Sequence, residues 1–166
     1  MTASGCGVTV REYGQLLADD PEYADKAQKI SAATRDLSEI VDQSHPGVVE
    51  GAKAIQVAFH SPCTLQHGQQ IRGKVESTLE RAGFQLVEVT DSHLCCGAAG
   101  TYSMLQSDIS GKLLGNRLRS LQGANPDVIV TANIGCQVHL ESRSEVPVLH
   151  WIELMDNPGT VRKTHR

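Results

Sequence analysis

The sequence has 166 residues, of which 20% are charged and 4% are aromatic, and its net charge is −4. Its Lys and Arg residues are scattered and base-stacking side chains are few, so we expect no nucleic-acid partner. No apolar run is long enough to span a bilayer, and the N-terminus lacks the pattern of a signal peptide. We therefore expect a cytoplasmic chain that reaches the inner face of the plasma membrane only through partners.

The N-terminal segment predicts two helices. Residues 1–10 are small and Gly-rich, and a first helix is expected to begin near Val10. Asp20 and Pro21 are a good N-cap and first helical residue for a second helix that runs to Asp42. Its apolar residues recur every three or four positions, so one face of this helix should be packed. Residues 44–53 follow as a linker.

From Ala54 onward, short apolar runs alternate with amphipathic segments. The apolar runs predict four strands, at residues 54–59, 84–89, 127–131 and 146–150. The other segments predict helices at residues 69–82, 108–121, 136–142 and 151–155. Strands that alternate with crossover helices predict an α/β fold with a parallel, Rossmann-like four-stranded sheet, preceded by an N-terminal helical segment. The polar tail, residues 158–166, should be frayed.

Four cysteines follow three of these predicted strands. Cys63 lies after the first strand, Cys95 and Cys96 lie after the second, and Cys136 lies after the third. The carboxyl ends of parallel strands meet at one edge of a sheet, and ligands gather there. The four thiols should therefore lie close together, without any assumption about family.

Such a group of thiols indicates metal or redox chemistry. The cysteine count, five, is odd, and cytoplasmic cysteines are more often metal ligands or redox thiols than disulfides. Soft thiolates suit iron–sulfur clusters, and small residues such as Gly97, Gly100 and Gly135 let a cluster approach the backbone.

Two alternatives use the same thiols. A zinc ion could be bound, but zinc knuckles usually bring cysteines in pairs two residues apart. Here 31 residues separate Cys63 from Cys95, and 39 separate Cys96 from Cys136. The other alternative is a metal-free redox pair at Cys95 and Cys96, which the strain of a disulfide between adjacent residues disfavours.

Cys6 lies in a short internal repeat. Residues 2–8 and 131–138 share the pattern Thr-Ala-x-Gly-Cys-x-Val when one residue is skipped. We interpret residues 1–50 as the helical end of a first unit plus a linker, and residues 51–157 as a complete second unit. On this interpretation the chain is the C-terminal part of something longer, and Cys6 is a candidate ligand without its companion cysteines.

Several motifs resemble the cysteine-rich CCG domain family, which includes the heterodisulfide reductase catalytic subunit and iron–sulfur subunits of flavin-linked dehydrogenases. The segments with this resemblance are HSPCTLQHGQ at 60–69, CCGAAGTYS at 95–103, NIGC at 133–136 and HWIE at 150–153. Within the family, these segments are most similar to glycolate oxidase iron–sulfur subunits, as are SGCG at 4–7 and EYG at 12–14.

The resemblance implies a [4Fe–4S]-type cluster held by Cys63, Cys95, Cys96 and Cys136. It also implies electron transfer from an FAD-containing partner subunit, on which glycolate is oxidised, toward the quinone pool, so the chain alone should not be active. The sequence departs from the family in two ways. The final Cys-x-x-Cys of the family ends here in His139, a candidate replacement ligand, and the ferredoxin-like half with its Cys-x-x-Cys-x-x-Cys runs, an implied partner, is missing.

Six further residues are weaker candidates. His60 and His150 lie at strand ends, where each is either functional or a loop histidine with ordinary hydrogen bonds. Thr101 and Tyr102 either contact a cofactor or simply pack. His67 and His93 are the weakest of the six.

Overall fold

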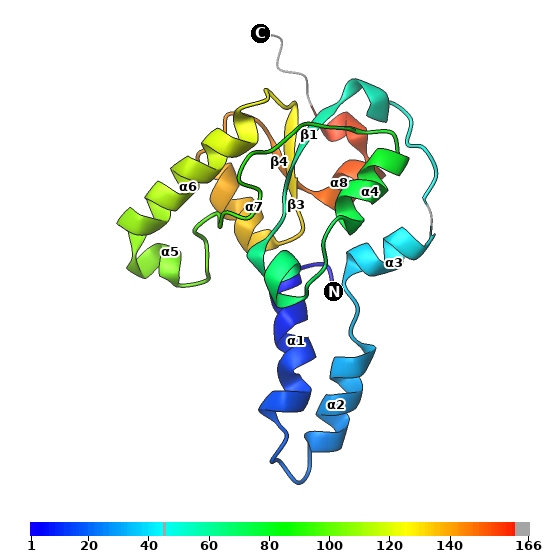
Figure 1. Cartoon of the computed structure of the whole chain (residues 1–166), viewed down its shortest axis with the longest axis vertical. Helices are drawn as coiled ribbons and strands as arrows, with labels where there is room; N and C mark the ends of the chain where they lie inside the picture. Colours follow the sequence, from blue (N-terminus) through cyan, green and yellow to red (C-terminus); the bar gives the residue numbers. More distant parts are fainter. Residues whose placement is uncertain (45, 162–166) are drawn as a thin grey trace.

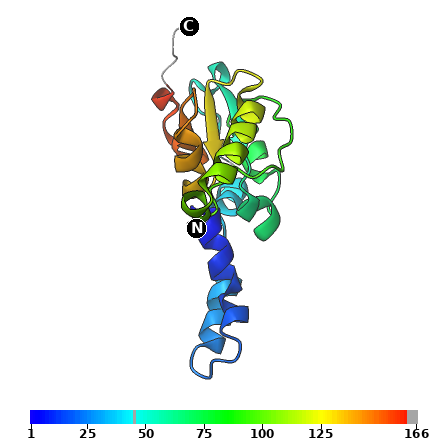
Figure 2. The same ribbon diagram turned by 90° about the vertical axis from the view of Figure 1, so that its left-hand side faces the viewer.

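The computed structural model describes residues 1–44 and 46–161; His45 of the predicted linker and residues 162–166 of the predicted tail lie outside the described residues. A two-helix arm projects from an α/β domain (Figures 1 and 2). The arm consists of α1 (Ser4–Leu16) and α2 (Ala24–Ala33), which lie side by side.

The domain is built on a parallel sheet with the strand order β2-β1-β3-β4. The strands are β1 (Gln56–His60), β2 (Gln85–Leu86), β3 (Val128–Thr131) and β4 (Val148–His150). His60 pairs with Thr131, and Thr131 pairs with His150, so β1, β3 and β4 end in one row. The predicted α/β fold with a parallel four-stranded sheet is confirmed.

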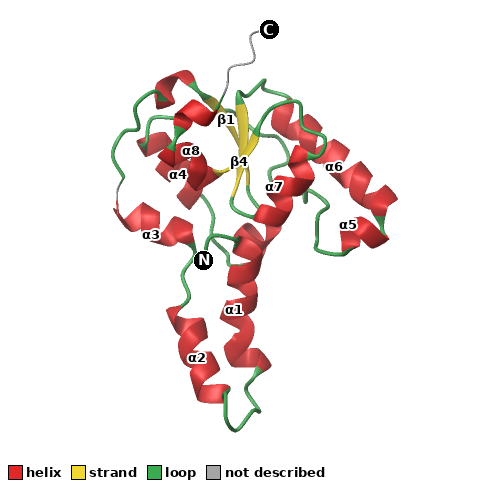
Figure 3. Ribbon diagram, turned by 180° about the vertical axis from the view of Figure 1, so that it is seen from behind, coloured by secondary structure: helices red, strands yellow, loops and turns green. Residues whose placement is uncertain are grey.

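Helices cover both faces of the sheet (Figures 1 and 3). One face packs against α3 (Leu37–Ser44), α4 (Lys74–Arg81) and α8 (Trp151–Asp156). The other packs against α6 (Ser107–Gln122), which the short α5 (Tyr102–Leu105) precedes, and α7 (Ile134–Glu141). Residues of β3 alternate between the two cores, with Val128 and Val130 in the first and Ile129 in the second, as the period of a strand requires.

The first helix begins earlier than predicted. It starts at Ser4 rather than near Val10, so Cys6 lies in its first turn. The Gly-rich composition of residues 1–10 argued against a helix, but the backbone N–H of Ser4 bonds to the carbonyl of Ala132 in the domain. A tertiary contact thus supports a helix start that local propensity disfavours.

The predicted helix from Pro21 to Asp42 is in fact two helices, α2 and α3. Asp36 lies at the break, where its carboxylate accepts hydrogen bonds from the backbone N–H and the hydroxyl of Ser38. Such local bonds start a new helix rather than continue the old one. The predicted packed face is also incomplete, because Ala27 is buried whereas three of its apolar residues are exposed: Tyr23, Ile30 and Ile40.

Other boundaries differ because turns replace regular structure. The strand predicted at 84–89 is reduced to the two residues of β2. The helix predicted from 69 starts at Lys74 after Gly73, whose φ is 72°, and a π-helical turn, η2 (Thr64–Gly68), precedes it. The predicted linker contains a 3-10 turn, η1 (Ala52–Ala54).

The tail predicted to fray from residue 158 is ordered over its described part. Residues Pro158–Thr160 form a 3-10 turn, η3, in which the side chain of Asn157 accepts from the N–H of Gly159. Val161 is buried in the core beside α8. Apolar burial at Val161 therefore outweighs the polar composition of this segment.

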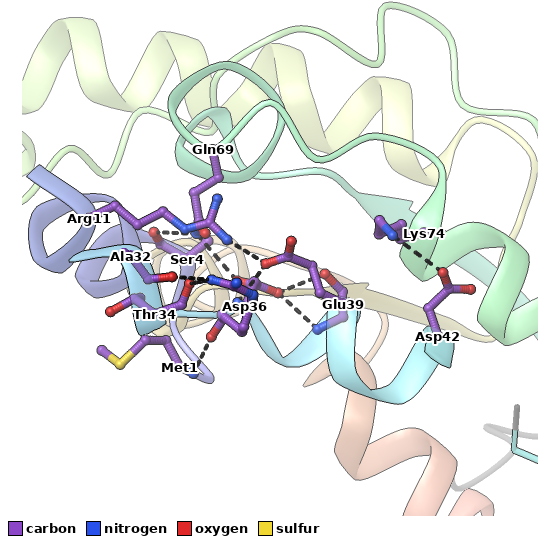
Figure 4. Close-up of polar contacts among 12 residues, drawn as sticks. Met1, Ser4, Arg11, Ala32, Thr34, Asp36, Glu39, Asp42, Gln69 and Lys74 are labelled. Atoms are coloured by element: carbon purple, nitrogen blue, oxygen red, sulfur yellow. Dashed lines mark hydrogen bonds and ion pairs between the residues drawn. The ribbon is translucent and has the colours of Figure 1, made fainter. Parts of the chain in front are cut away.

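Figure 4 shows the polar contacts that join the arm to the domain. The amide of Gln69 donates to the carbonyl of Ser4 at 3.0 Å and to the carboxylate of Asp36 at 3.3 Å. Arg11 of α1 forms an ion pair with Glu39 of α3. These partly buried contacts fix the base of the arm against the η2 turn.

The N-terminal residues also lie along the carboxyl edge of the sheet. The hydroxyl of Ser4 lies 2.7 Å from that of Thr64, which follows β1. His150 at the end of β4 has its Nε2 2.8 Å from the carbonyl of Thr2. The start of the chain is therefore adjacent to the ends of these strands, where the cysteine loops begin.

Candidate metal centre

Three segments carry the cysteines away from the edge of the sheet. Cys63 lies three residues beyond the end of β1, at the start of the η2 turn. Cys95 and Cys96 lie in the long loop between β2 and α5. Cys136 lies in the first turn of α7, directly after β3. The parallel order of β2, β1 and β3 brings these segments together.

The four sulfurs form a continuous series of thiol–thiol contacts. Cys63 contacts Cys95, Cys95 contacts Cys96, and Cys96 contacts Cys136. Along this series the side chains pass from exposed Cys63, through partly buried Cys95, to buried Cys96 and Cys136. The structure thus brings together all four cysteines that the strand ends predicted.

These contacts divide the thiols into donors and acceptors. A hydrogen bond from Cys63 lowers the pKa of Cys95 to about 2, and one from Cys96 lowers the pKa of Cys136 to about 5. Conversely, the pKa of Cys63 is raised by its bond to Cys95, and that of Cys96 by its bond to Cys136, with burial adding to both. These interactions favour the thiolate form at Cys95 and Cys136, and a thiolate is the form that ligates metals.

Backbone and side-chain N–H groups point at two of these sulfurs. The N–H of Gly97 donates to the sulfur of Cys95 at 3.3 Å, and the side-chain amide of Asn133 donates to that of Cys136 at 3.6 Å. Gly97 has a φ of 91°, which an L side chain rarely adopts. Glycine at this position therefore permits the backbone conformation in which the N–H of Gly97 faces the thiol of Cys95.

Two buried basic side chains lie behind the sulfurs. His60 at the end of β1 and Arg117 of α6 are both fully buried. The Nε of Arg117 donates to Nδ1 of His60 at 2.9 Å, and one of its terminal nitrogens donates to the carbonyl of Asp91 at 3.0 Å. A ring nitrogen of His60 and the sulfurs of Cys96 and Cys136 all lie within 4.8 Å of one another. Burial lowers the pKa of Arg117, which the nearby Cys96 and Asp91 partly offset.

This set of donors fits a thiolate-bound metal centre. Iron–sulfur clusters are held by cysteine thiolates and are tuned by N–H groups that donate to sulfur. Both features are present, and the exposure of Cys63 leaves one side of the group open. The buried Nε2 of His60, which has no regular hydrogen-bond partner among the described residues, is a further polar atom beside the sulfurs.

The structure does not bring the two secondary ligand candidates into this group. Nε2 of His139 lies 3.2 Å from the hydroxyl of Ser110, which donates to the carbonyl of Gly97. His139 instead lines an open cavity of about 430 Å³ with residues of the 98–103 loop. Cys6 is exposed on α1. The close group of possible metal ligands found among residues 1–44 and 46–161 is His60, Cys96 and Cys136; it contains neither of these two candidates, nor Cys63 and Cys95.

The remaining sequence candidates have different surroundings. His150 caps α8, with its ring accepting from the N–H of Ile152 and its backbone N–H donating to Glu153. The other weak candidates lie at or near the surface: His67, His93, Thr101 and Tyr102. Sequence reasoning ranked His60 no higher than His150, although its position as the last residue of a strand, before Ser-Pro-Cys, was the available signal. No feature of the sequence around Arg117 indicated a role beside the thiols.

No helix within the described ranges is both long and apolar enough to cross a membrane. The parallel sheet and the four thiols at its carboxyl edge define a cysteine-rich α/β domain with a candidate metal centre. Residues 57–141 match the family described as CCG, cysteine-rich domain, and the chain belongs to this family. The match includes all four clustered cysteines.

Relatives with longer chains align with most of this sequence. The glycolate oxidase iron–sulfur subunit of Escherichia coli is 48% identical over 157 residues, which are 93% of this chain and 38% of that protein. The uncharacterized protein YkgE of the same bacterium is 27% identical over 92% of this chain and 67% of its own length. Lactate utilization protein A of Halalkalibacterium halodurans is 26% identical over 97% of this chain and 69% of its own length. The chain thus spans well under half of the first of these relatives.

Proposed function

We propose that the chain holds an iron–sulfur cluster of the [4Fe–4S] type through Cys63, Cys95, Cys96 and Cys136. The observation that carries this proposal is the unbroken series of four sulfurs from three separate segments of the chain, two of the thiols having a lowered pKa. When bound, such a cluster accepts and passes on single electrons.

The residues of the chain would serve this role in distinct ways. The buried thiols Cys96 and Cys136 would anchor the cluster in the core, while exposed Cys63 would leave one side accessible for electron exchange with a partner. Donation from Gly97 and Asn133 to sulfur would stabilise negative charge. The buried guanidinium of Arg117 would offset the charge of the thiolates, as its electrostatic interaction with Cys96 indicates.

We further propose that the chain acts in an oxidoreductase that oxidises glycolate or a related 2-hydroxy acid. The support is its similarity to the glycolate oxidase iron–sulfur subunit of Escherichia coli. Substrate oxidation would occur on an FAD-containing partner, and electrons would pass to the quinone pool with the help of a ferredoxin-like iron–sulfur half. Such a complex would sit at the inner face of the membrane through its other subunits. The chain alone would then be inactive.

We also propose that the chain consists of one complete unit and the end of a preceding one. Residues 51–157 would be a complete cysteine-rich unit, and residues 1–50 would be the end of a preceding unit plus a linker. The matched residues 57–141 fall inside the first of these ranges. The similar positions of Cys6 and Cys136, each in the first turn of a helix, support two copies of one unit.

The test is to measure iron, acid-labile sulfide and zinc in anaerobically purified protein. We expect iron and sulfide in near-equal amounts. Separate Cys95→Ser, Cys96→Ser and Cys136→Ser variants should lose them, whereas Cys6→Ser, which changes the cysteine outside the group, should keep them. Zinc without sulfide would instead favour a structural zinc site, since four thiolates also satisfy zinc. Unchanged iron in all three variants would refute the proposed ligands.

A further inference from the structure

The contact between Arg117 and His60 determines where the imidazole carries its proton. A guanidinium has only N–H groups and can only donate hydrogen bonds. Because its Nε donates to Nδ1 of His60 at 2.9 Å, Nδ1 must offer its lone pair. The single proton of a neutral imidazole is then on Nε2.

Nε2 is the ring nitrogen left for the sulfurs. It is buried and has no regular hydrogen-bond partner within residues 1–44 and 46–161, while a ring nitrogen of His60 lies within 4.8 Å of the sulfurs of Cys96 and Cys136. A nitrogen that carries a proton has no lone pair for a metal ion. Arg117 therefore makes His60 a donor toward sulfur and prevents it from being a ligand, although its position beside two cysteines is that of a metal site.

We propose that His60 is a positioning residue that donates its Nε2–H to the sulfur of Cys136, and that Arg117 fixes it in this tautomer. The consequence for redox chemistry rests on the cluster proposed above. A donor to a ligating sulfur stabilises the more negative, reduced state, so it raises the reduction potential. The three residues come from three elements, since Arg117 is on α6, His60 ends β1 and Cys136 is on α7.

The first test measures the unaltered chain and uses a substitution only to assign the His60 signal. Long-range ¹H–¹⁵N spectra of the full, metal-free, reduced chain at pH 7.5 distinguish the two imidazole tautomers. His60 is assigned as the signal that disappears in His60→Gln. We expect the Nε2–H tautomer. The Nδ1–H tautomer would overturn the inference whether or not the protein binds a cluster, which keeps this result separate from the test of the proposed function.

The second test measures the potential of the bound cluster by an EPR-monitored titration. His60→Gln can place an N–H near the position of Nε2, whereas His60→Leu removes the donor. We expect both variants to retain iron and sulfide. At a fixed potential, His60→Leu should show an about tenfold lower ratio of reduced to oxidised cluster, equivalent to about 59 mV for one electron. His60→Gln should stay close to the parent.

Matched control substitutions distinguish the effect of the His60 donor on the reduction potential from a general disturbance of the structure. His67→Leu changes an exposed histidine on the neighbouring η2 turn, and Arg119→Met changes an exposed arginine on the same helix as Arg117. Both should leave the potential unchanged, whereas Arg117→Met should lower it because His60 loses its fixed tautomer. If His60→Leu leaves the potential unchanged, or if both His60 variants lose iron as Cys136→Ser does, the proposed role of His60 is wrong.

Discussion

The backbone N–H of Ser4 donates a hydrogen bond to the carbonyl of Ala132 at 3.0 Å. Ala132 follows the last residue of β3 and precedes Asn133, which donates to the sulfur of Cys136. The arm is therefore attached directly beside a loop of the candidate centre, although the two residues are far apart in sequence. Changes at the junction test whether the arm belongs to the folding unit.

Gly7 lies in a tightly packed part of this junction. A Cβ at Gly7 would lie 2.7 Å from Nε2 of Gln69, and this buried amide cannot move without losing its hydrogen bonds. We expect Gly7→Ala to lower the free energy of unfolding by about 1–3 kcal/mol in urea denaturation. Gly5→Ala on the same helix is the control, because its nearest neighbour, Asn133, is 3.5 Å away. Equal effects of the two substitutions would contradict the packing argument.

The buried carboxylate of Asp36 gives a second prediction. It accepts from the backbone N–H and hydroxyl of Ser38 and from the amide of Gln69. Asp36→Ala would leave these donors unsatisfied, so it should lower the free energy of unfolding by about 2–4 kcal/mol. Asp25→Ala, at an exposed position on α2, should change it by less than about 0.5 kcal/mol. Thermal or urea unfolding of both variants makes the comparison, and a stable Asp36→Ala protein would disprove the assigned role.

The sheet and the thiol group could be predicted because both depend on simple regularities. The apolar runs before Cys63 and Cys136 were long enough to indicate buried strands; β3 lies within its run, and β1 extends one residue beyond its run, to His60. Parallel strands end at one edge, so the positions of the cysteines after the strands were sufficient to group them. Neither step required knowledge of side-chain packing.

The contact of Arg117 with His60 beside the thiols could not be predicted from such regularities. Arg117 and His60 are 57 positions apart, and an arginine within an amphipathic helix usually faces solvent. Its burial depends on how α6 lies on the sheet, which no local pattern determines. The break at Asp36 was missed for a related reason, since the helical period continues across it. The carboxylate is buried against Gln69, which lies 33 residues away.

His150 makes stability depend on pH. Burial lowers its pKa, although the carbonyl of Thr2 and the charges of Glu153 and Asp36 act in the opposite direction. In the unfolded chain its pKa returns to the ordinary value for a histidine, 6.5. As pH falls through this value the unfolded state binds a proton before the folded state does, so stability decreases.

The corresponding measurement is urea unfolding between pH 7.5 and pH 5. Replacing His150 by Gln should make the loss of stability toward pH 5 smaller, because one proton-binding difference is removed. His93→Gln, at an exposed position, serves as the control and should follow the parent curve. A His150→Gln curve parallel to that of the parent would mean that other groups cause the pH dependence.

The turn after the adjacent cysteines gives the most direct test of the geometry of the centre. Gly97 has a φ of 91°, and a Cβ there would lie 2.8 Å from the carbonyl oxygen of Ser110 and 3.0 Å from Cβ of Leu113. Gly97→Ala therefore combines backbone strain with overpacking against α6, and should cost about 2–4 kcal/mol of stability. Because its N–H donates to Cys95, the substitution should also displace that thiol and reduce the bound iron.

Gly100 provides the matched control for this prediction. Its φ is also positive, at 57°, but an added Cβ would have no atom within 4 Å in the described part of the chain, its two chain neighbours aside. Gly100→Ala should then cost only about 1–2 kcal/mol, from the left-handed backbone alone, and should leave the iron content unchanged. Iron and sulfide are measured per folded protein in both variants, after urea unfolding has given their stabilities. If Gly97→Ala retained all of its iron, the position of the Cys95 sulfur would not depend on the Gly97 turn, and the assigned role of its N–H would be wrong.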